Sequence, residues 1–181
     1  MKMIWAERAL TAKGWVSSVS IGIGADGRIE TISDTPAPPV EGEKVGILLP
    51  APSNLHSHAF QRAMAGMTES RGNNSNDSFW TWRVLMYRFL DQLTPTDIEA
   101  ITVFVQMEML EAGYAGVAEF HYLHHQPDGA QYDDIAELSN RIAAAAVESG
   151  IGLTLLPVLY EHGGCDGRAL QGGQRRFGND V

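Results

Sequence analysis

Cysteine, cationic side chains and long apolar runs are all scarce in this chain. Its one cysteine, Cys165, has no partner for an internal disulfide and no second thiol with which to hold a metal. Lysine and arginine together number 13 against 22 aspartates and glutamates, and the formal net charge of −9 argues against a nucleic-acid partner. No apolar run approaches the roughly 18 residues of a membrane span, and the start lacks the pattern of a secretory signal. We therefore expect a soluble, cytoplasmic protein that binds a small molecule, with no nucleic acid and no membrane as partner.

The chain opens with a pattern typical of β structure. Residues 16–32 alternate apolar with small or polar side chains on either side of a Gly-Ala-Asp-Gly turn, which predicts a hairpin. The proline-rich stretch 35–40 is unsuited to the inside of a sheet, because proline donates no backbone hydrogen bond. We therefore expect an N-terminal β segment at residues 1–44 and a second module at 45–181.

From residue 45 onward, the pattern changes to strands that alternate with helices. The apolar run Val45–Leu49 predicts a strand buried on both faces, and it leads towards a pair of histidines. Ser78 and Thr94 are placed to cap two helices. Strands separated by helices indicate βα units and a parallel sheet. The further elements expected are a strand at 116–121, a helix that opens at Asp133 or Asp134 and ends at Gly150, and a buried strand at 151–159.

Three βα units are too few to close a barrel. A (β/α)8 barrel usually needs about 250 residues, and this chain has 181. The α/β pattern therefore predicts the first units of a barrel that is incomplete in this chain. The alternative is a small open α/β sheet that is complete in itself.

His56 and His58 are the strongest sign of chemistry in the sequence. Side chains two residues apart on an extended segment point to the same face, so two imidazoles can converge on one metal ion. Catalytic zinc normally takes three protein ligands and keeps one position open for water. At least one further ligand must therefore come from elsewhere in the fold.

Four blocks of residues resemble the amidohydrolase superfamily and, more closely, the formimidoylglutamate deiminases. The blocks are Asn54–Arg62 within Pro50–Gly66, Phe79–Arg83 with Met86-Tyr87, Val117–His125, and Gly173–Phe177. Two departures from the family pattern are Ala51, where glycine is expected, and the residues after Phe177. The resemblance covers the N-terminal two fifths of a family member, and it implies the first part of a metal-dependent-hydrolase TIM barrel, preceded by a small segment of a composite β-sandwich domain.

The same resemblance implies a role for five residues. His56 and His58 match the pair that binds a single zinc ion, and Gln61, Arg83 and Tyr122 match positions that hold the substrate. The implied reaction is the hydrolysis of N-formimino-L-glutamate to N-formyl-L-glutamate and ammonia, in histidine degradation. The remaining zinc ligands and the catalytic acid and base are expected beyond Val181, so this chain alone is expected to be an inactive fragment. The resemblance also allows a homodimer of the full-length protein.

Two other function classes stay open at this point. One is another amidohydrolase, such as a guanine or cytosine deaminase or a triazine-type chlorohydrolase, and the other is a non-catalytic module that keeps the fold. Single residues also have simpler explanations, because Arg83 could pair within its helix, Gln61 could bond within a loop and Tyr122 could be a core ring. No ligand role is predicted for the remaining histidines. Glu119 on a buried strand is expected to need a partner, and one hypothesis is that it orients a metal-ligand histidine.

Overall fold

The computed structural model describes residues 2–68 and 78–180. The chain divides into two compact units, Met1–Ala51 and Pro52–Val181, and each is described by itself. This division falls seven residues after the boundary expected at residue 44. The difference arises because the strand expected to open the second module belongs to the first.

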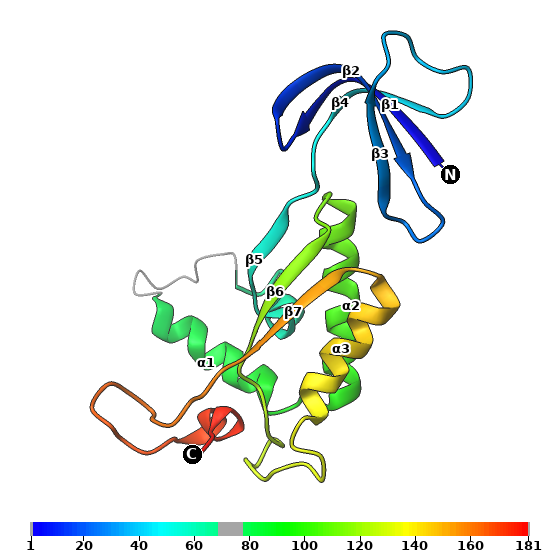
Figure 1. The fold of residues 1–181 in the computed structure, drawn as a ribbon. Helices are drawn as coiled ribbons and strands as arrows, with labels where there is room; N and C mark the ends of the chain where they lie inside the picture. The colour runs from blue at the N-terminus through cyan, green and yellow to red at the C-terminus, as the bar shows by residue number, and fades with distance from the viewer. Residues whose placement is uncertain (1, 69–77, 181) are drawn as a thin grey trace. The chain divides into compact units, whose positions relative to one another are not determined.

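The first unit is a four-stranded sheet in the order β3-β2-β1-β4 (Figure 1). The predicted hairpin is present, since β2 and β3 pair antiparallel around a turn in which Gly27 has a φ of 77°. A small apolar cluster of Ala6, Ala9, Val19 and Ile21 lies on one face of the sheet. The strands are β1 (Lys2–Thr11), β2 (Gly14–Ile23), β3 (Ile29–Asp34) and β4 (Glu43–Leu48).

The position predicted for the apolar run Val45–Leu49 is wrong. Most of it forms β4, which pairs in parallel with β1 of the first unit. Val45 and Leu48 pack on the apolar cluster there, while Ile47 is 63% exposed, so the strand is only partly covered. A run of apolar residues cannot by itself distinguish a strand buried on both faces from one that borders a small sheet. The strand that does lead to the histidines is β5, Ser53–Ser57, which has little apolar character.

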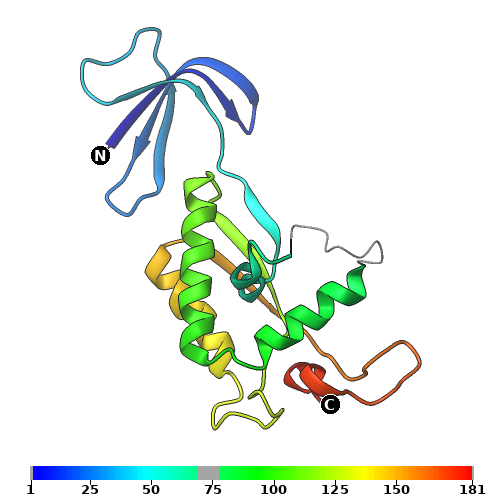
Figure 2. The ribbon, with the colours of Figure 1, turned by 180° about the vertical axis from the view of Figure 1, so that it is seen from behind.

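The second unit is built on a parallel three-stranded sheet in the order β5-β6-β7. Helices α2 and α3 lie on the same face of this sheet (Figures 1 and 2), as the predicted βα units require. The remaining elements are the 3-10 helices η1 (Ala59–Met64) and η2 (Gly172–Phe177), the helices α1 (Phe79–Leu90), α2 (Pro95–Glu111) and α3 (Glu137–Ser149), and the strands β6 (Gly116–His121) and β7 (Gly152–Pro157).

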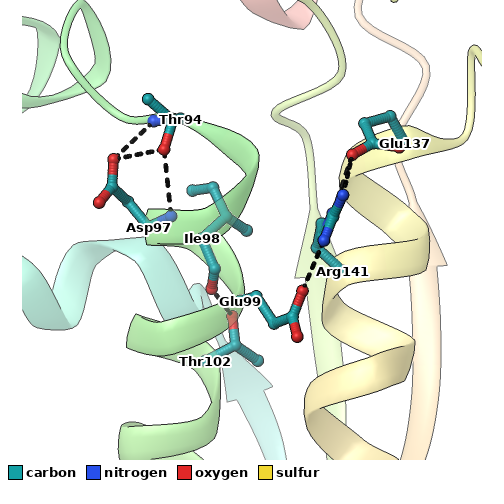
Figure 3. Close-up of polar contacts among 7 residues, drawn as sticks. All are labelled: Thr94, Asp97, Ile98, Glu99, Thr102, Glu137 and Arg141. Carbon is teal, nitrogen blue, oxygen red and sulfur yellow. Dashed lines mark hydrogen bonds and ion pairs between the residues drawn. The ribbon is translucent and has the colours of Figure 1, made fainter.

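Capping side chains begin two of the helices at the predicted residues. Ser78 accepts a hydrogen bond from the backbone N–H of Trp80 at the start of α1. At the start of α2, Thr94 and Asp97 bond reciprocally to one another's backbone N–H groups (Figure 3). Each reciprocal cap satisfies N–H groups that have no partner inside the helix.

The third helix begins later than predicted. The carboxylate of Asp134 accepts a bond from the N–H of Ala136 at 2.9 Å, which makes a local turn, and α3 starts at Glu137. Ile135, which precedes this start, is 66% exposed. The end at Gly150 is confirmed, with a left-handed φ of 80° that favours glycine.

Packing between α2 and α3 includes a charged bridge on their surface. The guanidinium of Arg141 on α3 pairs with Glu137 at 2.7 Å and with Glu99 on α2 at 2.9 Å (Figure 3). The main apolar core lies beneath, between the helices and the sheet. Its buried members are Phe60, Met64, Met86, Leu90, Leu93, Ile98, Leu123, Leu138, Ile142 and Phe177.

The opposite face of the sheet is open. Leu55 is 79% exposed, and Phe120 and Leu156 are each 43% exposed. Strand β7 was expected to be buried, but all six of its residues are exposed or half-buried because no layer of the described residues covers its second face. Closure of the sheet into a barrel stays a prediction. Within the described residues, no helix is long and apolar enough to cross a membrane.

A fully buried arginine fixes the segment near the end of the chain. The guanidinium of Arg176 on η2 donates to the carbonyls of Leu90, Leu93 and His125, which lie near the end of α1 and after β6. Buried carbonyls with such partners avoid the cost of desolvation without a hydrogen bond. Arg176 thereby holds its neighbour Phe177 in the core of the second unit.

Candidate functional site

The two histidines lie at the carboxyl end of β5. His56 belongs to the strand, and its backbone N–H donates to the side chain of Asn54 at 3.0 Å. His58 follows directly after the strand and occupies the position before η1, without a capping side-chain hydrogen bond. The centroids of the two imidazole rings are 5.0 Å apart, with 78° between the ring planes. The structure therefore brings together the two rings that the sequence predicts as metal ligands.

His58 is held in a defined orientation. Its Nδ1 lies 3.0 Å from the carbonyl oxygen of Phe120, at the carboxyl end of β6. Burial lowers the pKa of this imidazole, the bond to Phe120 opposes that effect, and the neighbouring His56 lowers the pKa further. In the neutral ring, Nδ1–H donates to the carbonyl and Nε2 keeps a free lone pair. This is the arrangement usual for a histidine that ligates a metal.

A cavity of about 640 Å³ opens beside the histidine pair. All five predicted site residues line it. They come from β5, η1 and α1 and from the segments that directly follow β5 and β6. The other lining residues are mostly aromatic or apolar, which is typical of a small-molecule site. The lining consists of His56, His58, Gln61, Phe79, Trp82, Arg83, Met86, Phe120, Tyr122, Val158, Tyr160 and Phe177.

Tyr122 and Gln61 form one polar part of this cavity. The side-chain amide of Gln61 donates to the hydroxyl of Tyr122 at 2.9 Å. The Tyr122 ring meets His58 and Phe177 edge to face, with centroid distances of 5.1 and 4.9 Å. Burial raises the pKa of Tyr122 to about 12, so its hydroxyl stays protonated and can donate to a ligand.

Arg83 supplies positive charge to the same cavity. Its Nε donates to the hydroxyl of Tyr87 at 2.7 Å, and one terminal nitrogen donates to the hydroxyl of Tyr160 at 3.3 Å. Desolvation lowers the pKa of Arg83, but the bonds and charge interactions with Tyr87 and Tyr160 outweigh it and raise the pKa. Across residues 2–68 and 78–180, no carboxylate forms an ion pair with Arg83. The guanidinium is therefore placed to bind a carboxylate from outside the chain.

Sequence reasoning did not identify Tyr160 and Phe177 as residues of this site. Tyr160 follows β7 much as Tyr122 follows β6, and residues after neighbouring parallel strands gather at one edge of a sheet. That signal could have found Tyr160. Phe177 comes from η2, and its place beside Tyr122 depends on the buried contacts of Arg176, which no local pattern predicts.

The remaining histidines do not line this cavity. His124 and His125 each place Nε2 against a backbone carbonyl, of Val158 and Gly178 respectively. His121 is buried, and burial, followed by the charge of His124, lowers its pKa to about 3. The described part of the chain contains no group of three or more His, Cys, Asp or Glu side chains that could hold a metal.

The donor set at the cavity nevertheless fits part of a metal site. It consists of two close imidazoles, and His58 has its second nitrogen fixed by a carbonyl. Nitrogen donors of this kind suit zinc as well as several other transition metals. A complete site needs at least one more ligand than the described residues provide.

Comparison with known families agrees with the predicted resemblance. The family described as "Formimidoylglutamate deiminase HutF, N-terminal domain" matches residues 1–43. A protein of Pseudomonas aeruginosa named formimidoylglutamate deiminase is 54% identical over 179 residues, which cover 99% of this chain and 39% of that protein.

Solved structures point in the same direction. The crystal structure of an amidohydrolase from Brucella melitensis aligns with a TM-score of 0.90 and 47% identity, over 99% of this chain and 40% of the other. Zinc-bound atrazine chlorohydrolase TrzN from Arthrobacter aurescens TC1 aligns with a TM-score of 0.61 and 19% identity, over 86% of this chain and 35% of the other. At that identity the likeness shows the fold alone.

The chain spans about two fifths of the length of the Pseudomonas aeruginosa and Brucella melitensis relatives. Its α/β architecture and its order of elements agree with the N-terminal part of the amidohydrolase fold. The resemblance predicted from four sequence blocks is therefore confirmed: this chain is similar, over nearly all of its residues, to part of a formimidoylglutamate deiminase.

Proposed function

We propose that this chain is the N-terminal part of a zinc-dependent deiminase that hydrolyses N-formimino-L-glutamate to N-formyl-L-glutamate and ammonia, a step of histidine degradation. One observation carries the proposal. The histidine pair and the guanidinium of Arg83, which forms no ion pair with the described residues, line the same cavity, so a metal-binding group and a carboxylate-binding group can act on one ligand. The 54% identity to a protein named for this activity supports the choice of substrate.

His56 and His58 would hold the metal in this proposal, with the remaining ligands supplied by other parts of the enzyme. Zinc, when bound, lowers the pKa of its water ligand towards about 7 and so supplies hydroxide at neutral pH. Water adds to the formimino carbon and the carbon–nitrogen bond to the terminal nitrogen breaks, which yields a formamide and ammonia. The groups that carry protons in these steps are not assigned to residues of this chain.

The other residues of the cavity bind and orient the substrate. Arg83 offers its free N–H groups to a substrate carboxylate, while Tyr87 and Tyr160 fix the plane of the guanidinium. Gln61 and Tyr122 bond to each other, and the protonated Tyr122 hydroxyl can donate to a polar group of the substrate. The aromatic walls exclude water from the bound chain of the substrate.

The test uses the complete enzyme, meaning the polypeptide in which these 181 residues are followed by the C-terminal part that the Pseudomonas aeruginosa relative contains. Replacing Arg83→Met removes a charged hydrogen-bonding partner of the substrate. We expect kcat/KM for N-formimino-L-glutamate to fall about 30-fold, mainly through KM, since bonds to charged groups contribute roughly 2 kcal/mol.

Arg88→Met is the matched control, because Arg88 lies exposed on the same helix and outside the cavity. We expect it to leave both constants near the wild-type values. Unchanged turnover in Arg83→Met would contradict the proposed carboxylate contact. Turnover of a cyclic amidine in preference to the formimino substrate would instead favour a guanine or cytosine deaminase or a triazine-type chlorohydrolase.

Other expectations remain part of the proposal. They are a location in the cytoplasm, one zinc ion per active site, a homodimer of the complete enzyme, and no role for nucleic acid or membrane. A non-catalytic module is the competing class, and it would have no reason to retain zinc. Metal analysis of the complete enzyme tests the zinc content, and light scattering tests the homodimer.

A further inference from the structure

The pairing of strand β5 is irregular beside the histidine pair, between Asn54 and Ser57. Strand β5 pairs in parallel with β6 through Asn54 and Val117, but the next pair is Ser57 with Glu119, so three steps on one strand match two on the other. The extra residue lies at Leu55 or His56. Bulges of this kind bend a strand and interrupt its ladder of backbone hydrogen bonds, and they are common beside active sites.

A buried carboxylate holds the segment just after this irregularity. Glu119 on β6 is only 3% exposed, and its Oε1 accepts a hydrogen bond from the backbone N–H of Ala59 at 2.6 Å. The side chain of Ser57 also bonds to Glu119. Within the described ranges, no lysine, arginine or histidine forms an ion pair with this carboxylate. Its described partners therefore both come from the segment that carries the histidines.

The two partners of Glu119 alternate with the two histidines along the chain. Ser57 and Ala59 are buried, whereas His56 and His58 line the cavity. The next residue of β6, Phe120, accepts from the ring of His58 through its carbonyl. Neighbouring residues of β6 thus hold the backbone of the histidine segment from one side and the His58 ring from the other.

We propose that Glu119 is a positioning residue that pins the bulged histidine segment to β6 and so sets the direction in which His56 and His58 present their nitrogens. Its carboxylate replaces the backbone ladder that the irregularity interrupts. The proposal rests on the proposed function only in its consequence for metal affinity. The positioning itself concerns the metal-free chain.

The first experiment needs no metal. In the metal-free complete enzyme labelled with nitrogen-15 at histidine, NMR reports whether the His58 proton sits on Nδ1, as the bond to Phe120 requires. We expect one Nδ1–H tautomer in the wild type and in Glu119→Gln, which still accepts from Ala59. In Glu119→Leu, which has no acceptor, we expect a mixture of tautomers. A single unchanged tautomer in Glu119→Leu would overturn the proposal.

The second experiment measures zinc affinity by competition with a chelator. We expect Glu119→Leu to weaken zinc binding about 10- to 100-fold, the range typical for loss of a group that orients a metal ligand, and Glu119→Gln to stay within a few-fold of the wild type. Unchanged affinity in Glu119→Leu would count against the proposal.

Glu108→Leu is the matched control for loss of a carboxylate. Glu108 on α2 also holds the segment after β5, through a two-bond ion pair with Arg62, which lies outside residues 56–59. We expect this variant to lower thermal stability without changing the His58 tautomer or the zinc affinity. An equal effect of both variants on tautomer and affinity would show general loosening and would overturn the specific role of Glu119.

The outcomes separate this inference from the proposed function. If His58→Ala binds zinc as tightly as the wild type, the proposed metal site is wrong, and the tautomer experiment still decides the role of Glu119. If His58→Ala loses zinc and Glu119→Leu does not, the metal site stands and the positioning role fails.

Discussion

The two faces of the β5-β6-β7 sheet differ in what they require of their residues. The face covered by α2 and α3 buries Val117, Glu119 and His121 of β6, and the carboxylate of Glu119 accepts a hydrogen bond from the backbone N–H of Ala59. The other face of β6 carries Phe120 and leads to Tyr122, and its residues line a cavity or lie exposed. The covered face stabilises the unit, and the open face carries the candidate chemistry.

The largest expected effect on stability comes from a substitution in the core beneath the covered face. Ile142 on α3 is buried in the main core, and Ile142→Ala removes three carbons from a site that other elements enclose. We expect the free energy of unfolding of the complete enzyme to fall by about 3 kcal/mol in urea denaturation. The control Val147→Ala, at a position 86% exposed on the same helix, should stay within about 0.5 kcal/mol. Equal losses in both variants would contradict the assignment of the buried side of α3.

The second prediction concerns the open face in the 181-residue chain alone. Leu55 and Leu156 expose apolar surface there, so we expect the isolated chain to self-associate or aggregate. Replacing both with serine should raise the fraction of the chain that elutes as a monomer in size-exclusion chromatography several-fold. Val147→Ser should leave this fraction unchanged. A soluble monomer of the unaltered chain that melts cooperatively would contradict this prediction.

The smallest effect concerns a helix cap on the covered side. Hydrogen bonds from the Thr94 side chain and then from its backbone lower the pKa of Asp97. A carboxyl group with a lowered pKa in the folded state stabilises the protein when ionised, and this contribution is lost as the pH falls through that pKa. We therefore expect Asp97→Asn to lower stability by about 0.5 kcal/mol at pH 7 and by less near pH 3.

Thermal melting at the two pH values checks this prediction. Glu111→Gln at the other end of α2 is the control, and it should not lower stability at pH 7, because a negative charge is unfavourable near a helix C-terminus. A loss of stability in Asp97→Asn that is larger at pH 3 than at pH 7 would contradict the role assigned to the cap.

Local signals in the sequence predicted several elements correctly. Ser78 and Thr94 begin helices, and Gly150 ends one, because capping depends on a few neighbouring residues. The place of Val45–Leu49 could not be predicted in the same way, since the choice of neighbour for a strand depends on distant residues of β1. Strand β5 was missed because its sequence, Ser-Asn-Leu-His-Ser, lacks an apolar run.

The candidate site divides in a similar way. The resemblance named five residues, and the structure places all of them around one cavity, although their roles stay predictions. Tyr160 and Phe177 were not found because aromatic residues of the core and of a cavity wall look alike in sequence. The partners of Glu119 depend on the register between β5 and β6. This register includes an irregularity that no residue pattern predicts.

The central claim is that His56 and His58 direct their nitrogens at one metal ion. Anomalous diffraction at the zinc edge, from crystals of the complete enzyme, tests it most directly. We expect one peak within about 2.0–2.1 Å of a ring nitrogen of each histidine. A peak bonded to neither ring, or crystals of zinc-saturated enzyme with the two rings directed apart, would contradict the claim.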